Sequence, residues 1–203
     1  MHSIAIVLFD QVEVLDFAGP FEVFSVAGQR NIGEPFSVFT VAEQSPVTAR
    51  NHLVITPTHT FDDCPPSDFF LIPGGGGYHP DGTPFGSRKE MNNPVMLDWI
   101  RQRAVDAQLV MSVCTGSLIL GRAGMLEEKE ATTHYLAMDA LRSISPRIRV
   151  APEKRWTDNG KVITSAGVSA GIDMALHVVA RLQGDDVAAE TAAYMQYDSR
   201  PIG

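Results

Sequence analysis

Short apolar runs alternate with longer amphipathic stretches along the whole chain. The runs are rich in Ile, Val, Leu and Phe, as expected for strands that are buried on both faces of a parallel sheet. The predicted strands are residues 3–9, 36–41, 68–72, 109–113 and 162–165. Between these runs, apolar positions recur at helical spacing. The predicted helices are residues 17–27, 94–107, 115–123, 135–143, 170–183 and 185 to about 197.

Residues that favour helix ends stand next to several of these helices. Pro20 suits the first turn of the helix that begins near residue 17, and Gly28 suits its end. Asn93, followed directly by a proline, suits the start of the next helix. Ser169 and Asp185 are predicted to cap the last two helices.

The segments between these elements are predicted to be less regular. Residues 78–93 combine Gly, Pro, Asn and charged side chains, which predicts a long surface loop. Residues 52–57 are predicted to belong to a small hairpin, and residues 131–133 to form a short strand. Asn159-Gly160 is a hairpin signal. Residues 149–158 are therefore predicted as a strand and turn, and the strand after it either pairs back or joins the main sheet.

The alternation of strands and helices predicts an α/β fold with a mostly parallel, doubly wound sheet sandwiched by helices. We find no internal repeat and no linker-like shift in composition. A single domain over residues 1–203 is therefore expected. In open sheets of this kind, ligands bind beyond the carboxyl ends of the strands, so functional side chains are expected in the segments that follow the strands.

Composition and charge narrow the function classes. Hydrophobic residues make up 44% and charged residues 20%, which is typical of globular proteins. There are 16 Lys and Arg against 24 Asp and Glu, a net charge of −8, so no nucleic-acid partner is expected. No apolar run is long enough to span a membrane, and the first run has no basic flank of the kind that precedes a signal sequence. Two widely spaced cysteines predict neither a disulfide framework nor a zinc site, which favours a reducing, cytoplasmic location.

Cys114 is the strongest candidate for chemistry. It follows a predicted strand, precedes a predicted helix, and stands in the context Ser-Val-Cys-Thr-Gly. Small residues around a nucleophile on a strand-to-helix turn are typical of a nucleophile elbow. Unpaired N–H groups at the helix start favour thiolate, so we expect the pKa of Cys114 to fall below its ordinary value. The alternative is an inert cysteine, because free cysteines are among the most buried residues.

Two other segments follow strands on the same edge of the predicted sheet. The loop after residue 72 contains Gly74 and Gly75, whose N–H groups, with that of Thr115, are candidates for binding a developing negative charge. A flexible turn is the simpler interpretation of the same glycines. Asp16 is either a helix-starting residue or a buried acid. Beside Cys114, a carboxylate would raise the thiol pKa, whereas a protonated acid would donate a hydrogen bond to the thiolate and transfer protons.

Two further side chains belong to the candidate site. The Thr115 hydroxyl is a candidate contact for the substrate, although its position requires only a modest side chain. His134, in a Thr-Thr-His sequence, is the one histidine considered near the site, and a structural role is the competing interpretation. Cys64 is interpreted as an ordinary thiol, and Asp173 as an acid placed favourably in the first turn of its helix.

Five sequence segments, taken together and in order, resemble the ThiJ/PfpI superfamily. They are IVLFDQVEVLDFAGPFEVF, FDDCPPSDFFLIPGG, SVCTGSLILGRAGML, ATTHY and TSAGVSAGIDMALHVV. The resemblance implies a flavodoxin-like fold related to class I glutamine amidotransferases, and a homodimer. The branch most similar to this chain is that of the isocyanide hydratases, which implies Cys114 as nucleophile, Asp16 as its hydrogen-bonded acid, Thr115 in the pocket and the Gly75 amide facing the site.

Two positions in this chain differ from the residues that are typical of other branches of the superfamily. The protease branch has His directly after the cysteine, where this chain has Thr115, and the deglycase and glyoxalase branch typically has Glu at the position of Asp16. We therefore expect a hydratase for a small carbon–nitrogen substrate, without metal or organic cofactor. The alternatives are a glyoxalase or deglycase acting on 2-oxoaldehydes, and a redox or ligand sensor. Sensor domains of AraC-type regulators share the Cys-Thr-Gly pattern, but the helix-turn-helix region and basic surface of a regulator are not expected here.

Overall fold

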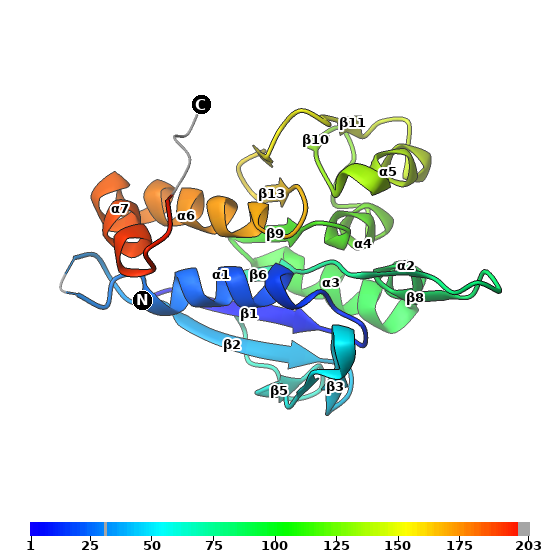
Figure 1. Ribbon diagram of the computed structural model, residues 1–203, viewed down its shortest axis with the longest axis horizontal. Helices are drawn as coiled ribbons and strands as arrows, with labels where there is room; N and C mark the ends of the chain where they lie inside the picture. Colours follow the sequence, from blue (N-terminus) through cyan, green and yellow to red (C-terminus); the bar gives the residue numbers. More distant parts are fainter. Residues whose placement is uncertain (31, 199–203) are drawn as a thin grey trace.

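A seven-stranded sheet forms the centre of the molecule, and the computed structural model that shows it describes residues 1–30 and 32–198. The strand order is β12-β13-β9-β6-β1-β2-β5 (Figure 1). Every neighbouring pair is parallel except β12 and β13. The strands are β1 (Ser3–Leu8), β2 (Ser37–Ala42), β5 (His59–Thr60), β6 (Phe69–Ile72), β9 (Leu109–Val113), β12 (Trp156–Asp158) and β13 (Val162–Ser165). The predicted α/β fold with a mostly parallel sheet is confirmed.

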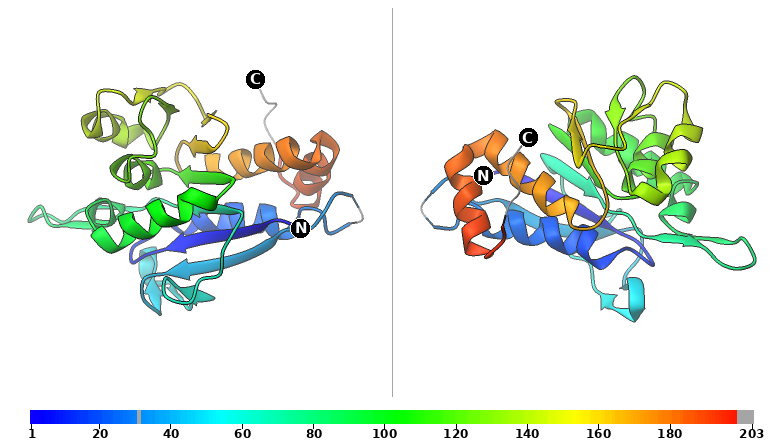
Figure 2. Two further views of the ribbon diagram at one scale, coloured as in Figure 1. Left: turned by 180° about the vertical axis from the view of Figure 1, so that it is seen from behind. Right: turned by 45° about the horizontal axis from the view of Figure 1, so that its top comes forward.

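Helices cover both faces of this sheet. On one face, α1 (Val14–Val26) packs against α6 (Ala170–Gln183), which contacts α7 (Asp185–Tyr194). The view from behind in Figure 2 brings α3 (Pro94–Asp106) in front of the sheet, with α1 and α6 beyond it. α4 (Gly116–Arg122) packs against α3. Because both faces are covered, all residues of β6, β9 and β13 are buried, which explains their continuous apolar sequences.

The helix starts follow the predictions only in part. Asn93 caps α3 as predicted, since its side chain accepts a hydrogen bond from the Val95 N–H. Helix α1 begins three residues before the predicted start, so Pro20 lies inside it and not in its first turn. Ser169 makes no capping hydrogen bond, and its hydroxyl accepts one from Arg155 instead. Asp185 is the first residue of α7, preceded by a glycine at the cap position.

The prediction that residues 78–93 form a long surface loop is wrong. The segment contains most of a hairpin of β7 (Gly76–Tyr78) and β8 (Pro84–Gly86), followed by α2 (Ser87–Glu90). Figure 1 shows this hairpin extending away from the sheet beyond α2. The first residue of α2 is fully buried. The segment lacks a long apolar stretch, so its sequence does not show that part of it packs into the protein.

Smaller elements complete the fold. β3 (Val47–Thr48) pairs with β4 (Val54–Ile55) around η1 (Arg50–His52), which confirms the small hairpin. β10 (Glu130–Ala131) pairs in parallel with β11 (Arg149–Val150), and η2 (Tyr135–Ala137) leads into α5 (Met138–Ile144). The Asn159-Gly160 turn joins β12 and β13, and β13 also joins the main sheet. Within the described ranges, every helix is too short or too polar to cross a membrane.

Candidate active site

Cys114 lies on a strained turn between β9 and α4. Its φ is 56°, in the left-handed region that residues other than glycine rarely adopt. Hydrogen bonds hold both sides of this residue: its N–H donates to the carbonyls of Ser165 (3.2 Å) and Ala166 (3.0 Å). Its carbonyl accepts from the hydroxyls of Thr133 (2.9 Å) and Ser117 (3.1 Å). The turn predicted from the sequence is therefore present and fixed by its surroundings.

The glycine two positions after the nucleophile is required by close packing. A Cβ atom at Gly116 would lie 2.0 Å from the carbonyl oxygen of Ile72, at the end of β6. Gly74 is equally confined, since a Cβ there would lie 2.5 Å from the Thr115 nitrogen and 2.9 Å from a carboxyl oxygen of Asp16. These close approaches bring the glycine loop, the elbow and the start of α1 together.

Asp16 is fully buried in the first turn of α1 and reaches the cysteine. Its Oδ2 accepts a hydrogen bond from the Gly74 N–H at 2.9 Å, and its carboxyl lies near enough to the Cys114 thiol for each group to shift the pKa of the other. Burial raises the pKa of Asp16 to about 7, against the lowering effect of the Gly74 and Cys114 hydrogen bonds. Among the described residues, its Oδ1 has no partner with full hydrogen-bond geometry. Burial therefore favours the protonated form of Asp16 over the pH range in which an exposed carboxyl is ionised.

The prediction that the pKa of Cys114 falls below its ordinary value is wrong. Beside a charged carboxylate, the pKa of this thiol is raised. Cys114 is only 6% exposed, and burial followed by the negative charge of Asp16 raises its pKa to about 12. Hydrogen bonds from the Thr115 amide and hydroxyl oppose this rise. When Asp16 is protonated, the negative charge that raises the pKa of Cys114 disappears. The two groups thus titrate as a pair, in which one proton is shared between carboxyl and thiol.

A chain of hydrogen bonds links Thr115 to the glycine loop. The Gly75 N–H donates to Thr115 Oγ1 at 3.0 Å, so this amide already has a partner. Ser87, at the start of α2, is fully buried, and its Oγ lies 2.7 Å from Thr115 Oγ1 and 2.6 Å from the Gly75 carbonyl oxygen. Because the Thr115 oxygen accepts from Gly75, the Thr115 proton is free to be donated to a neighbouring acceptor.

The roles of the glycine amides in binding negative charge stay predictions. In the structure, the Gly74 N–H donates to Asp16 and the Gly75 N–H donates to Thr115. Gly75 has a φ of 118°, and a Cβ on it would lie 2.3 Å from the Glu13 nitrogen. The loop therefore holds the side chains of Asp16 and Thr115 in place, and it does not form a flexible turn.

His134 lies beside the site with a structural partner. Its Nδ1 accepts a hydrogen bond from the Leu136 N–H at 3.3 Å, which caps η2. Burial and the positive charge of Arg88 lower the pKa of His134, so the ring is neutral at pH 7. A contact with substrate stays a prediction for this residue. The described residues contain no group of three or more His, Cys, Asp or Glu side chains that is arranged to hold a metal ion.

Sequence reasoning missed Ser87 and Arg88, which α2 places at the site. The Ser87 hydroxyl contacts Thr115, and the charge of Arg88 lowers the pKa of His134. Both residues lie in the segment that was predicted to be a surface loop. A Gly-Ser-Arg sequence carries no catalytic signature of its own, so only the packing of α2 against α4 reveals them.

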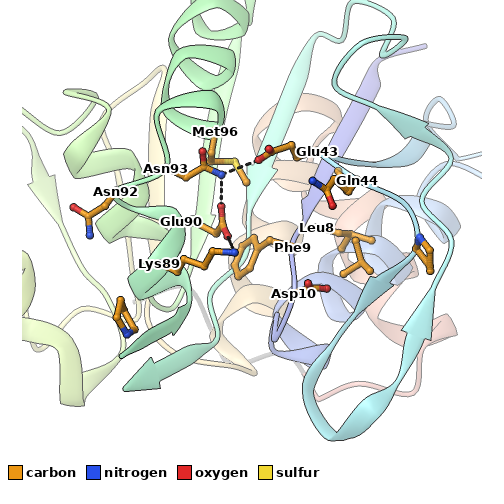
Figure 3. A pocket seen from close by; sticks show the side chains of 14 residues that line it. Leu8, Phe9, Asp10, Glu43, Gln44, Lys89, Glu90, Asn92, Asn93 and Met96 are labelled. Carbon is orange, nitrogen blue, oxygen red and sulfur yellow. Dashed lines mark hydrogen bonds and ion pairs between the residues drawn. The ribbon is translucent and has the colours of Figure 1, made fainter. Parts of the chain in front are cut away.

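A cavity of about 540 Å³ is lined by residues other than those of the candidate site (Figure 3). Phe9 and Asp10 line it from the end of β1, Glu43 from the end of β2, and Glu90 from α2. The Asn93 side chain donates to the carboxylates of both Glu43 and Glu90 at 2.7 Å, as the dashed lines in Figure 3 show. Of the described residues that line this cavity, none is a predicted site residue.

The structure combines a mostly parallel sheet between helices with a cysteine on a strained turn next to a buried carboxyl. The model of the DJ-1/PfpI family matches residues 2–181, and the chain belongs to this family. The resemblance to ThiJ/PfpI proteins is thereby confirmed.

Three relatives frame the comparison. The chain is 37% identical over 98% of its length to an isonitrile hydratase of Pseudomonas putida, of which it covers 80%. It is 32% identical to a ThiJ/PfpI family protein from Pseudomonas syringae of solved structure, with a TM-score of 0.82 over 100% of this chain and 77% of the other. It is also 26% identical, over 97% of its length, to the helix-turn-helix transcriptional regulator GbdR of Pseudomonas aeruginosa, of which it spans 51%.

The first prediction concerns the glycine of the elbow. Gly116→Ala places a Cβ against the Ile72 backbone, so we expect a loss of at least about 3 kcal/mol in the free energy of unfolding. Gly77→Ala is the matched control, because its Cβ would meet only the Phe85 side chain at 3.6 Å. Chemical denaturation measures both changes. Equal stability of the two variants would contradict the close packing described above.

The second prediction concerns the Thr115 hydroxyl. Its hydrogen bond lowers the pKa of Cys114, so Thr115→Val moves the pH profile of Cys114 alkylation by iodoacetamide to higher pH. Thr115→Ser keeps the hydroxyl and is expected to keep the profile. A background of Cys64→Ala ensures that only one thiol reacts. An identical profile in the Val variant would show that the hydroxyl does not act on the sulfur.

The third prediction concerns stability and pH. The pKa of Asp16 is raised from an ordinary value near 3.8 to about 7, so between these pH values the folded protein binds more protons than the unfolded chain. Stability therefore falls as the pH rises through this window. Asp16→Asn removes this fall, which is on the order of a few kcal/mol. Urea titrations at pH 5 and pH 8 measure it, with the exposed Asp139→Asn as control.

Proposed function

We propose that the protein hydrates a small isocyanide to an N-substituted formamide, with Cys114 as nucleophile. The observation that carries this proposal is the fully buried Asp16 carboxyl, which the Gly74 N–H holds at 2.9 Å in the loop beside the strained turn of Cys114. Such a pair can supply both a nucleophile and a proton at neutral pH. The identity of 37% with an isonitrile hydratase over nearly the whole chain supports the same chemistry.

In the first step, the Cys114 sulfur attacks the terminal carbon of the isocyanide, and a carbon–sulfur bond forms. The same carbon receives the proton that the Asp16–Cys114 pair holds. The product is a thioimidate, in which the former isocyanide carbon carries one hydrogen, the sulfur and a double bond to nitrogen. The proton is delivered inside a buried site, where no second donor is required.

In the second step, water adds to the thioimidate carbon. Asp16, now a carboxylate, accepts a proton from the water and passes it to the nitrogen, so that the carbon carries a hydroxyl group and an N–H group. The resulting tetrahedral intermediate collapses, the carbon–sulfur bond breaks, and the N-substituted formamide leaves. One water molecule is consumed, and the hydroxyl proton of the intermediate passes to the Asp16–Cys114 pair as the carbonyl group forms. The side chains of this chain supply every group in the cycle, so the proposal includes no metal or organic cofactor.

A second candidate is a sensor that binds a ligand or oxidant at Cys114 without turnover. The similarity to the regulator GbdR over 97% of this chain favours it, although this chain spans only about half of that protein. A thiol that shares a proton with a carboxyl also suits reversible oxidation. The glyoxalase or deglycase alternative has no observation of its own in its favour. The homodimer and the cytoplasmic location remain predictions.

The fourth prediction tests the hydratase. Formation of N-substituted formamide from a simple alkyl isocyanide is expected for the wild type and for Cys64→Ala, because the Cys64 thiol donates its hydrogen bond to the neighbouring Pro65 carbonyl and not to a residue of the candidate site. Cys114→Ala is expected to abolish it, and Asp16→Asn to lower kcat by at least about a hundredfold, as for other proton-transferring groups. Mass spectrometry of the Asp16→Asn variant detects any covalent adduct. Wild-type turnover no faster than that of Cys114→Ala would end the hydratase proposal and leave the sensor.

A further inference from the structure

The Ser87 hydroxyl has one proton and two acceptors within reach. The residue is fully buried at the start of α2, and its Oγ lies 2.6 Å from the Gly75 carbonyl oxygen and 2.7 Å from Thr115 Oγ1. The same carbonyl also accepts a hydrogen bond from the Ser87 backbone N–H at 2.9 Å. The hydroxyl can therefore donate to Thr115 without leaving the buried Gly75 carbonyl unpaired.

The Thr115 oxygen then has a donor on each of its two lone pairs. It accepts the Gly75 N–H at 3.0 Å and the Ser87 hydroxyl at 2.7 Å. With both lone pairs occupied, this oxygen acts on a further group only through its own proton. Without the Ser87 hydroxyl, one lone pair is open, and Thr115 can also accept a hydrogen bond from a neighbouring S–H or O–H group.

The Thr115 hydroxyl borders the same small space as the Asp16 carboxyl. The point where a Cβ atom on Gly74 would stand is 2.6 Å from Thr115 Oγ1 and 2.9 Å from Asp16 Oδ2. Thr115 also directly follows the nucleophile in the sequence. Its hydroxyl lowers the pKa of Cys114, which is the effect of a donor that stabilises a thiolate. Whatever fixes the direction of this hydroxyl therefore acts on the Cys114 sulfur.

We propose that Ser87 is a positioning residue: its hydroxyl occupies the second lone pair of Thr115 Oγ1 and so makes Thr115 a donor, and not an acceptor, toward the nucleophile. Hydrogen bonds in such a chain polarise one another, so the Thr115 proton is also a stronger donor when Ser87 donates behind it. A thiolate only accepts hydrogen bonds and is stabilised by this arrangement. A thiol loses the open lone pair to which its S–H could donate.

This proposal rests on the proposed function only for its part in turnover. In the hydratase cycle, the sulfur attacks as a thiolate and leaves again when the carbon–sulfur bond breaks. Ser87 supports both steps through Thr115 and does not touch the substrate. Alkylation of Cys114 requires no isocyanide, because the sulfur attacks the CH₂ carbon of iodoacetamide and iodide leaves. The action of Ser87 on the thiol can therefore be measured separately from hydration.

Replacing Ser87 by alanine leaves the titratable groups around the thiol in the chain. Those that act on Asp16, on Cys114 or on each other are Glu13 and Asp16 at the start of α1, Arg88 in α2 and His134 before η2. A displacement of α2 could still change the effect of Arg88 on this site. Such an effect does not depend on the Thr115 hydroxyl, so a variant without that hydroxyl separates the two causes.

The fifth prediction concerns Ser87→Ala in the Cys64→Ala background. We expect the pH profile of Cys114 alkylation by iodoacetamide to move to higher pH, with a rate at pH 7 that is about threefold lower, the effect of one lost supporting hydrogen bond. Ser112→Ala is the matched control and keeps the profile, because it removes a fully buried hydroxyl that has no partner among the described residues. Looser packing would instead expose the thiol and speed its alkylation at every pH. An unchanged or faster reaction of Ser87→Ala overturns the proposal.

The same substitution in a Thr115→Val background shows whether Ser87 acts through Thr115. Valine has no oxygen to receive the Ser87 proton, so Ser87→Ala is expected to cause no further shift of the profile there. A shift of the same size in both backgrounds overturns the proposal. With a simple alkyl isocyanide, Ser87→Ala is expected to lower kcat at pH 7 about threefold. If the wild type forms no formamide, yet the shift depends on Thr115, the hydratase fails and the role of Ser87 stands.

Discussion

One shared proton between Asp16 and Cys114 determines what this site can do. Both groups are buried, so two negative charges side by side are unfavourable, and burial raises the pKa of the carboxyl to about 7. A thiolate at this position therefore requires a protonated neighbour. In the proposed hydratase, the same requirement makes Asp16 the proton donor when the Cys114 sulfur attacks. Desolvation by itself suppresses the thiolate, and it thereby couples the protonation of the two groups.

The surroundings of this pair are built to hold it in place. Gly74 donates to the carboxyl, and Thr115 interacts with the sulfur through both its amide and its hydroxyl. Behind them, Gly75 and Ser87 fix the Thr115 hydroxyl, so α2 takes part in the geometry although it is only one turn long. The site is consequently more ordered than a glycine-rich sequence suggests, because each glycine is present to allow a close approach between segments.

The sheet, the turn at Cys114 and the candidate residue Asp16 could be predicted from the sequence, whereas helix α2 could not. Continuous apolar strands and the spacing of Cys114 and Gly116 depend on local rules that can be read along the chain. The direction of the Cys114 pKa was mispredicted, because the argument from the helix start included the dipole and omitted burial. Ser87 and Arg88 escaped notice for a different reason. Their importance depends on where α2 packs, and nothing in a Gly- and Pro-rich segment specifies that packing.

The strand order explains why residues so far apart in the sequence meet. From β1 the chain continues to β2 and β5 on one side, then returns to β6, β9 and β13 on the other. The direction reverses between β1 and β6, and connections on opposite faces leave a crevice at such a point. Asp16 follows β1 and Gly74 follows β6, while Cys114 follows the next strand, β9. The reversal of strand order therefore brings Asp16 close to Cys114, and the strained turn at Cys114 is the only further feature needed to place the two side chains together.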